Sequence, residues 1–303
     1  MDRQKVPYRV VVVALLSMVL PTVAQAGAVL DKIKSAGAIT IGHRESSRPF
    51  SYLDDQQQPI GYSMDICLRV VDEIKSALKL PALRVGYKLV TTKDRIAMIK
   101  DGGIDLECGS TTNTLERQKD VAFSVTTYVA AVRMVAKKSA KVRTLWDVRG
   151  KRVVSTADTT SFKQLTEQNE RERHKMEIVS GMDHAESFAM VEDGRAVAFV
   201  MDDILLAGLV ANAKNPADYA ITGAPLSVEP YGIMLKRDDA ELKKLVDGAI
   251  VALFKSGEIT KIYNKWFMAP IPPKGINLNT PMSDGLKKVI ANPTDSGNPA
   301  AYF

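Results

Sequence analysis

The 303-residue chain has only two cysteines and three histidines. Cys67 and Cys108 lie far apart and the histidines form no H-x-x-x-H pair, so the ligand spacing of a zinc site is missing. Neither cysteine has a neighbouring base of the kind that a thiol nucleophile needs. The sequence also lacks a Gly-rich phosphate loop and a G-x-S-x-G motif. These absences argue against metal-dependent, nucleophilic and phosphate-binding chemistry.

Aromatic residues and an excess of one charge are also scarce. Phe, Trp and Tyr make up 6% of the chain, and the net charge is +6 with Lys and Arg interleaved among Asp and Glu. Without a basic stripe and stacking aromatics, nucleic-acid binding is not indicated. The remaining composition, 46% hydrophobic over 303 residues, suits a globular protein of about two domains.

The first residues have the features of a secretory leader. Three basic side chains precede an apolar run, Val10–Leu20, and Ala24 and Ala26 then form an A-x-A pattern. This order predicts a cleavable signal peptide over residues 1–26. The apolar run is shorter than the ~20 residues of a membrane span, although an uncleaved anchor is the alternative. We expect an exported, soluble protein.

Export leaves two states open for the cysteines. An oxidising compartment permits a bridge between Cys67 and Cys108. Both also lie in apolar contexts, Cys67 in a predicted helix and Cys108 in a predicted strand, where buried free thiols are equally compatible. The sequence does not decide between them.

Apolar strand-like runs alternate with amphipathic helical patterns, which is typical of an α/β fold with a mainly parallel sheet. The pattern occurs twice, and extended segments at 124–138 and 223–237 link the two sets. We therefore expect two lobes joined by a hinge, with a ligand cleft at the carboxyl ends of the strands. The tail after Trp266 is rich in Pro and Asn and is expected to wrap a surface. The predicted strands are residues 38–42, 83–90, 104–109, 151–156, 176–181 and 196–202, and the predicted helices include residues 63–78, 92–102, 160–172 and 184–194.

The strongest local feature is the stretch ECGSTTNTLERQKDVAFS, residues 107–124. A strand ends at Gly109, hydroxyl side chains follow from Ser110 to Thr112, and Arg117 comes soon after. Hydroxyls, backbone amides and a guanidinium beyond a strand end are good donors to a carboxylate. The alternative is a Ser/Thr-rich turn that caps a short helix, with Arg117 in solvent.

Several motifs in order along the chain resemble one family. HRESSRPFSY, ECGSTTN, ERQK, DHAESF, GRAVAFVMDD and YGIMLK are similar to type II periplasmic solute-binding proteins of ABC importers for polar amino acids, and most of all to the glutamate/aspartate-binding members. The resemblance covers essentially the whole mature chain. It implies an α/β, two-lobed periplasmic-binding-protein fold of type II with a two-strand hinge. The implied division is lobe 1 over 27–127, hinge 128–132, lobe 2 over 133–225, hinge 226–230, and the second part of lobe 1 with the C-terminal tail over 231–303.

The resemblance assigns a ligand α-carboxylate to Ser110, Thr112 and Arg117, and the ligand α-ammonium to Asp202. Asp202 ends a predicted strand, where an Asp often caps the next helix instead. Asp203 follows at once, and we expect Asp203 to cap and Asp202 to face the ligand.

Thr160 matches a position where a loop enters a helix and holds an anion with its hydroxyl and nearby amides. Plain helix capping explains Thr159 and Thr160 equally well. Family members have glycine before the threonine pair, where this chain has Asp158, so the shape of the loop is an open question.

Arg44, Thr92, Arg95 and His184 match positions of the acidic-ligand members. Alone, each would be read as a surface group or a cap. Relatives for neutral or cationic amino acids have an acidic or amide residue at the position of Arg44. The co-occurrence of Arg44, Arg95 and His184 therefore favours a pocket for a second carboxylate, with His184 as a neutral or charged donor.

Other candidates have weaker support. Phe50 and Tyr52 are expected either to pack on the ligand stem or to belong to the core, and His43 and His174 are interpreted as bystanders.

The implied function is an extracytoplasmic receptor that binds L-glutamate and/or L-aspartate by lobe closure and delivers it to the permease subunits of an ABC transporter. We expect a periplasmic monomer without cofactor or metal. The alternative is a cyclohexadienyl dehydratase-like enzyme on the same fold, with Glu45 or Glu107 as general acid. A sensory module for a receptor kinase is a third interpretation, against which the free-standing length and the leader argue.

Overall fold

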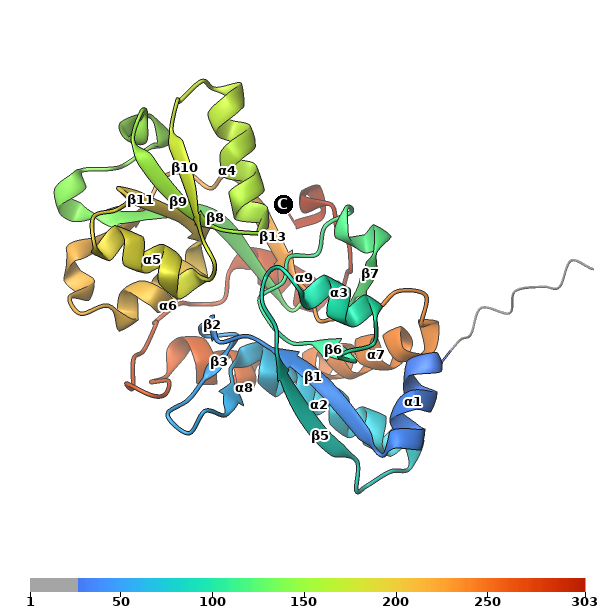
Figure 1. Ribbon diagram of the computed structural model, residues 1–303. Coiled ribbons are helices and arrows are strands. Elements are labelled where there is room, and N and C mark those ends of the chain that lie inside the picture. Colours follow the sequence, from blue (N-terminus) through green and yellow to red (C-terminus); the bar gives the residue numbers. More distant parts are fainter. Residues whose placement is uncertain (1–26, 303) are drawn as a thin grey trace, which may run out of the picture.

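A computed structural model describes residues 27–302, which form two lobes (Figure 1). The predicted signal peptide lies outside the described residues. Lobe 1 is built on a five-stranded sheet in the order β5-β1-β6-β14-β7. Lobe 2 is built on a six-stranded sheet in the order β10-β9-β11-β8-β12, with β13 paired to β8. Two sheets with flanking helices confirm the α/β organisation expected from the alternating pattern. The expectation of a mainly parallel sheet is wrong, because each sheet combines parallel and antiparallel pairs.

In lobe 1, β1 pairs in parallel with β5 and β6, while β14 runs antiparallel to β6 and β7. The helix α2 illustrates how the sequence builds this lobe, because Ile66, Val70 and Ile74 recur at helical spacing and are fully buried. The elements of lobe 1 are α1 Ala28–Ala36, β1 Ala38–His43, α2 Tyr62–Leu78, β5 Arg84–Leu89, α3 Arg95–Lys100, β6 Leu106–Glu107, β7 Val121–Phe123, β14 Met234–Lys236, α7 Ala240–Ser256 and α8 Glu258–Tyr263, together with a small sheet of β2 Ser46–Ser47, β3 Ser51–Leu53 and β4 Pro59–Ile60.

In lobe 2, β9 pairs in parallel with β10 and β11, and β8 runs antiparallel to β11, β12 and β13. The inner strand β11 is buried at every position, as expected of a strand covered on both faces. The elements of lobe 2 are β8 Tyr128–Lys137, β9 Arg152–Thr156, α4 Thr160–Arg171, β10 Glu177–Gly181, α5 His184–Glu192, β11 Ala198–Asp202, α6 Asp203–Asn212, β12 Tyr219–Thr222 and β13 Val228–Tyr231.

Two strands connect the lobes. The start of β8 pairs with β13, in the register Tyr128 with Tyr231 and Ala131 with Val228. The two tyrosines pack with Phe50 in an aromatic cluster, at ring distances of 4.8 and 5.1 Å. Phe50 and the neighbouring Tyr52 are 0% and 1% exposed and belong to the hydrophobic core, so the interpretation of both as core residues is the correct one.

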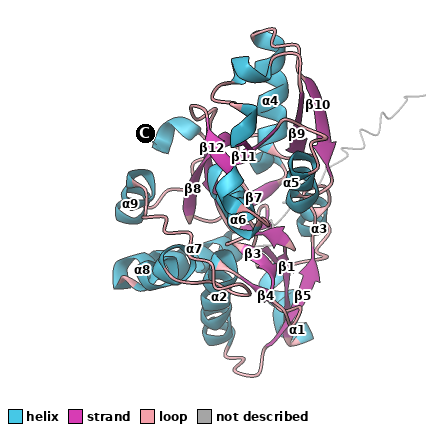
Figure 2. Ribbon diagram, turned by 90° about the vertical axis from the view of Figure 1, so that its left-hand side faces the viewer, coloured by secondary structure: helices cyan, strands magenta, loops and turns pink. Residues whose placement is uncertain are grey.

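The tail does wrap a surface, but it also contains a helix that its composition did not predict. The helix α9 (Asp284–Ala291) packs against β8 and α7, and a short turn at Pro299–Tyr302 packs against β13 (Figure 2). The Tyr302 hydroxyl lies 2.8 Å from that of Thr126. The tail therefore packs against both connecting strands, β8 and β13.

The structure decides between the two cysteine states. Cys67 of α2 and Cys108, just after β6, form a disulfide with a Cα–Cα distance of 6.3 Å. Within residues 27–302 no helix is long and apolar enough to cross a membrane. In the same range no three His, Cys, Asp or Glu side chains gather as a metal site would require.

Candidate functional site

A small cavity lies between the lobes. Its walls are the ends of strands from both sheets: β1 and β6 in lobe 1, and β9 and β11 in lobe 2. The carboxyl ends of parallel strands thus converge on one space, as in other open α/β sheets. The cavity is lined by Arg44, Thr92, Arg95, Ser110, Thr112, Arg117, Thr159, Thr160, His184, Met201 and Asp202.

All nine residues that the sequence analysis singled out line this cavity. Sequence reasoning missed one further lining residue, Met201, and counted Thr159 as a cap alone. Met201 precedes Asp202 at the end of β11, a position that a strand-end argument reaches only if both last residues are considered. Glu45 is exposed and Glu107 is buried, and neither lines the cavity. His43 and His174 do not line it either.

Lobe 1 supplies three arginines. Arg44 and Arg95 are each 3% exposed, and Arg117 is partly exposed. Burial, with the charge of the neighbouring Arg95, lowers the pKa of Arg44 and of Arg117 to about 10. Burial also lowers the pKa of Arg95, although the carboxylate of Glu107 opposes this shift. Both values near 10 leave Arg44 and Arg117 charged at neutral pH, so this wall of the cavity is cationic.

Two of these guanidinium groups are held by groups of lobe 1. Arg95 donates to the Thr111 hydroxyl at 2.6 Å, and that hydroxyl donates to Glu107 at 2.7 Å. Arg117 donates to the backbone oxygen of Thr112 at 2.8 Å. The buried Glu107 thus lies behind the arginines and balances part of their charge.

Lobe 2 supplies a carboxylate. Asp202 accepts from the Ser161 hydroxyl at 3.0 Å and from the Tyr231 hydroxyl. Burial and the nearby charge of Glu229 raise the pKa of Asp202 to about 7. Asp203 instead accepts the backbone amides of Ala131 and Ile204. Asp202 lines the cavity as expected, but it is also the N-cap residue of α6, without a side-chain cap bond, so the expectation that Asp203 caps this helix is wrong.

The two threonines also separate. Thr159 is the N-cap of α4 and accepts from the Phe162 amide at 3.1 Å. Thr160 gives its hydroxyl hydrogen to Glu229 at 2.7 Å and lies 3.4 Å from Thr112 of lobe 1. Asp158, before the pair, has φ 57°, the left-handed backbone that Asp tolerates better than most residues. The loop therefore keeps, with an aspartate, a conformation that suits glycine.

His184 begins α5, and its Nδ1 lies 2.9 Å from the Thr156 hydroxyl. Burial and the charges of Arg44 and Arg95 hold the pKa of His184 well below its usual value. The ring is therefore neutral at pH 7 in this structure.

Four lining residues have buried polar atoms without a partner among the described residues: Arg44 Nη1, Arg95 Nε, Ser110 Oγ and His184 Nε2. A buried polar group without a hydrogen bond costs about 1–3 kcal/mol, and more if it is charged. Such groups gathered in one cavity indicate a ligand that pairs with them. The two arginine atoms call for an anion, whereas Asp202 at the opposite wall suits a cation.

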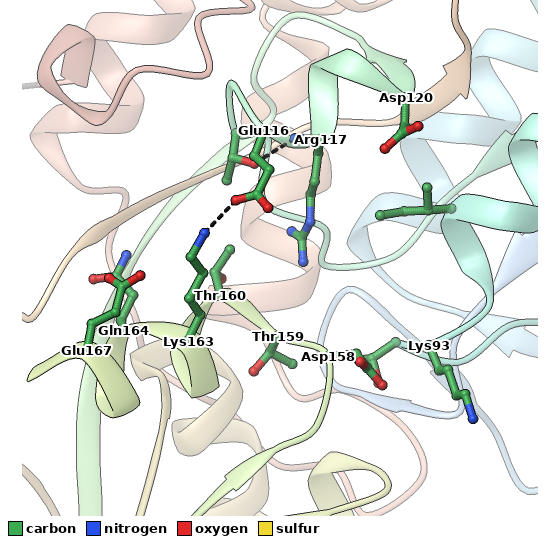
Figure 3. Close-up of a pocket in the computed structure, with 13 residues that line it drawn as sticks. Lys93, Glu116, Arg117, Asp120, Asp158, Thr159, Thr160, Lys163, Gln164 and Glu167 are labelled. Carbon is green, nitrogen blue, oxygen red and sulfur yellow. Dashed lines mark hydrogen bonds and ion pairs between the residues drawn. The ribbon is translucent and has the colours of Figure 1, made fainter. Parts of the chain in front are cut away.

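An outer pocket leads to the cavity and shares Thr92, Arg117 and the threonine pair with it (Figure 3). Across it, Lys163 of α4 forms an ion pair with Glu116 of lobe 1. Together with the approach of Thr112 to Thr160, this contact means that the lobes are closed on each other.

Two lobes that close over a small cavity with fixed charges define a binding protein for a small polar solute. Residues 39–269 match the bacterial extracellular solute-binding proteins, family 3, and the chain belongs to this family. It is 52% identical over 287 residues to the L-glutamate/L-aspartate-binding protein of Pseudomonas aeruginosa, covering 94% of each chain. It is 46% identical to the glutamate/aspartate import solute-binding protein of Escherichia coli, covering 89% of each. Among solved structures, an ancestral arginine-binding protein bound to arginine matches with a TM-score of 0.69 and 26% identity, over 76% of this chain and 98% of that one. The two-lobed, type II solute-binding fold expected from the sequence is thereby confirmed.

Proposed function

We propose that this protein captures L-glutamate or L-aspartate outside the cytoplasm and delivers it to the permease subunits of an ABC importer. One observation carries the proposal. Buried cationic and hydroxyl groups that have no hydrogen-bond partner among the described residues line the same cavity as one buried carboxylate, Asp202. An amino acid with an acidic side chain has two carboxylates and one ammonium, which match these groups in sign and number. The likeness to glutamate/aspartate-binding relatives supports the same ligand class.

Each lining residue has a proposed role. Ser110, Thr112 and Arg117 hold the α-carboxylate, and Asp202 holds the α-ammonium. Because the Thr160 hydroxyl gives its hydrogen to Glu229, Thr160 contributes its backbone amide at the start of α4, where a helix favours an anion. The remaining lining residues that we assign to the side-chain carboxylate are Arg44, Thr92, Arg95 and His184.

Binding is coupled to closure, since the ligand contacts groups of both lobes and only the closed form makes both sets of contacts. We place the hinge at 128–132 and 226–230, between lobe 1 (27–127 and 231–303) and lobe 2 (133–225). The paired start of β8 and β13 supports this placement. The leader over residues 1–26 directs the chain to the periplasm, where it acts as a monomer and releases its ligand chemically unchanged.

A thermal-shift screen of the common L-amino acids, followed by calorimetry, tests the proposal, because a ligand of the folded state raises its stability. We expect glutamate and aspartate to raise the melting temperature, and arginine and alanine to leave it unchanged. Recovery of all added glutamate after incubation with the protein checks that no turnover occurs. A response to neither acidic amino acid, or consumption of the ligand, would contradict the proposal.

A further inference from the structure

A chain of three hydrogen bonds connects His184 to the first turn of its own helix. The Ser187 hydroxyl donates to the backbone oxygen of Asp183 at 2.7 Å. The Thr156 hydroxyl lies 3.0 Å from Ser187 Oγ and 2.9 Å from His184 Nδ1. All of these groups except Asp183 are buried. The chain is shielded from water, so its hydrogens are assigned among these groups alone.

The chain has one consistent direction. A carbonyl oxygen only accepts, so the single hydroxyl hydrogen of Ser187 is used on Asp183. The bond between Ser187 and Thr156 therefore takes its hydrogen from Thr156. Thr156 then has no hydrogen left for the ring, and the bond to Nδ1 takes its hydrogen from His184. In a neutral imidazole this leaves Nε2 as a bare acceptor.

The residue that carries this bare nitrogen lines the cavity. His184 is 1% exposed, and Nε2 has no partner among the described residues. A ligand carboxylate placed against it would meet lone pair with lone pair, whereas a proton on Nε2 would make the contact a charge-assisted hydrogen bond. Protonation of the ring does not change the direction of this hydrogen-bond chain, which we call the His184 relay, because Nδ1 still donates to Thr156.

We propose that an acidic amino acid binds together with one proton, which the Nε2 lone pair of His184 takes from solvent to form a cationic ring that donates to the side-chain carboxylate. This inference rests on the proposed function and adds to it that His184 sets the proton stoichiometry. A side-chain amide would donate to the bare Nε2 directly and needs no proton. The residue thereby distinguishes glutamate from glutamine through proton uptake.

The charges around His184 explain why its ring is neutral without a ligand carboxylate and cationic beside one. Burial and the charges of Arg44 and Arg95 oppose a cationic ring and keep the pKa of His184 low. A ligand carboxylate neutralises part of that charge and raises the pKa of His184 in the complex. The other ionisable groups at the site end of the elements packed against α5 are Asp183 at its N-cap, Asp202 on β11, Asp203 on α6, Arg133 on β8, and Glu45 and Arg48 beside β2.

The relay offers a variant outside the ligand site. In Ser187→Ala, Thr156 no longer has an acceptor in Ser187 and turns its hydrogen to Nδ1, so the ring adopts the Nε2–H form and donates to a carboxylate without extra proton. The Asp183 oxygen keeps its bond from the Ser187 backbone amide, at 3.1 Å, so helix α5 retains its first turn. His174→Gln is the matched control, since His174 is also 1% exposed in lobe 2 but does not line the cavity.

Two measurements test the inference. Nitrogen NMR of the imidazoles, assigned with His174→Gln, should give a hydrogen on Nδ1 alone in the free protein and on both nitrogens with L-glutamate. Calorimetry with L-glutamate in buffers of different ionisation enthalpy should give an uptake greater by close to one proton in wild type and His174→Gln than in Ser187→Ala. This difference removes any proton that Asp202 releases to solvent when the ammonium binds, because Asp202 is the same in all three proteins.

Each outcome is decisive. An Nε2–H ring in the free protein, an unchanged ring on binding, or equal uptake in wild type and Ser187→Ala would overturn the inference while leaving glutamate binding in place. Absence of any heat with glutamate and aspartate would instead refute the proposed function, and the ring of the free protein would still test the relay.

Discussion

The two lobes bring opposite chemistry to one cavity. Lobe 1 contributes the guanidinium groups of Arg44, Arg95 and Arg117, whereas lobe 2 contributes the carboxylate of Asp202 and the neutral ring of His184. A simple dicarboxylate would satisfy lobe 1 and leave Asp202 without a cation. Only a solute that has both signs of charge makes favourable contacts with both lobes when they close. We therefore assign an amino acid and not a plain diacid.

The lobes also differ in what holds their groups in place. Two arginines of lobe 1 are held by groups of that lobe, since Arg95 donates to Thr111 and Arg117 to the backbone oxygen of Thr112. Asp202 and Thr160 of lobe 2 are instead bonded to the connecting strand β13, where Tyr231 donates to Asp202 and Glu229 accepts from Thr160. These two arginines are therefore fixed within lobe 1, while the ammonium site of lobe 2 is tied to the strand that links the lobes.

The largest effect is expected from the disulfide, which stabilises lobe 1 alone. A bridge across 41 residues of sequence restricts the unfolded chain and contributes about 3–4 kcal/mol in the loop-entropy treatment. The double variant Cys67→Ser, Cys108→Ser should lose about this much in the free energy of unfolding, measured with urea. Wild type under reductant is the control and should lose the same amount. Equal stability with and without the bridge would contradict the prediction.

Arg117→Ala should weaken every amino acid ligand, because all of them have an α-carboxylate. Loss of a charge-assisted contact to a buried carboxylate costs about 2–5 kcal/mol, or roughly 30-fold to 5,000-fold in Kd by calorimetry. Arg84→Ala, which changes an exposed arginine on the edge strand β5, is the control and should bind as wild type does. Unchanged affinity in Arg117→Ala would contradict the assignment of the α-carboxylate to this part of lobe 1.

Some features of the two lobes and their cavity could be predicted from the sequence, and others could not. The parallel strands and their polar carboxyl ends were predictable, since alternation and strand-end chemistry are local, and the family likeness predicted nine of the eleven residues that line the cavity. Strands of two residues, such as β2 and β4, have no periodicity to detect. The disulfide and the direction of the His184 relay depend on distances between residues far apart in sequence, which no local pattern contains. The tail helix α9 did leave a local signal: its N-cap Ser283 precedes Leu286 and Val289 at helical spacing.

Arg44→Ala should separate the two carboxylates of the ligand. Glutamate and aspartate should bind more weakly by about 10-fold to 160-fold, equivalent to about 1.5–3 kcal/mol for a charged hydrogen bond, because the buried Nη1 of Arg44 is assigned to the side-chain carboxylate. A neutral ligand such as glutamine, where wild-type binding is measurable, should lose far less. Glutamate affinity equal to that of wild type would defeat the assignment of Arg44 to the side chain.

The raised pKa of Asp202 predicts how the affinity for glutamate changes at acid pH. Only its ionised form attracts an ammonium, and burial with the charge of Glu229 raises its pKa to about 7. The affinity of wild type for glutamate relative to that of Asp202→Asn should therefore fall as the pH falls below about 7, by up to about tenfold per unit, and this ratio should be constant above it. Calorimetry of both proteins between pH 5 and 8 measures the slope of the ratio. Asp202→Asn is the reference because an amide does not titrate, and proton uptake by His184 is common to both proteins and cancels.

The smallest effect is expected at the rim, where Lys163 and Glu116 pair across the outer pocket. Both side chains are largely exposed, at 57% and 70%, and exposed ion pairs contribute little because water and salt screen them. Lys163→Met should change glutamate affinity by no more than about fivefold, and salt should abolish the difference. The reciprocal variant Glu116→Gln should behave alike. A loss as large as that of Arg44→Ala would mean that this contact, and not the charged walls of the cavity, holds the lobes together. Closure would then be driven by the rim, and the ligand groups of lobes 1 and 2 would serve selectivity alone.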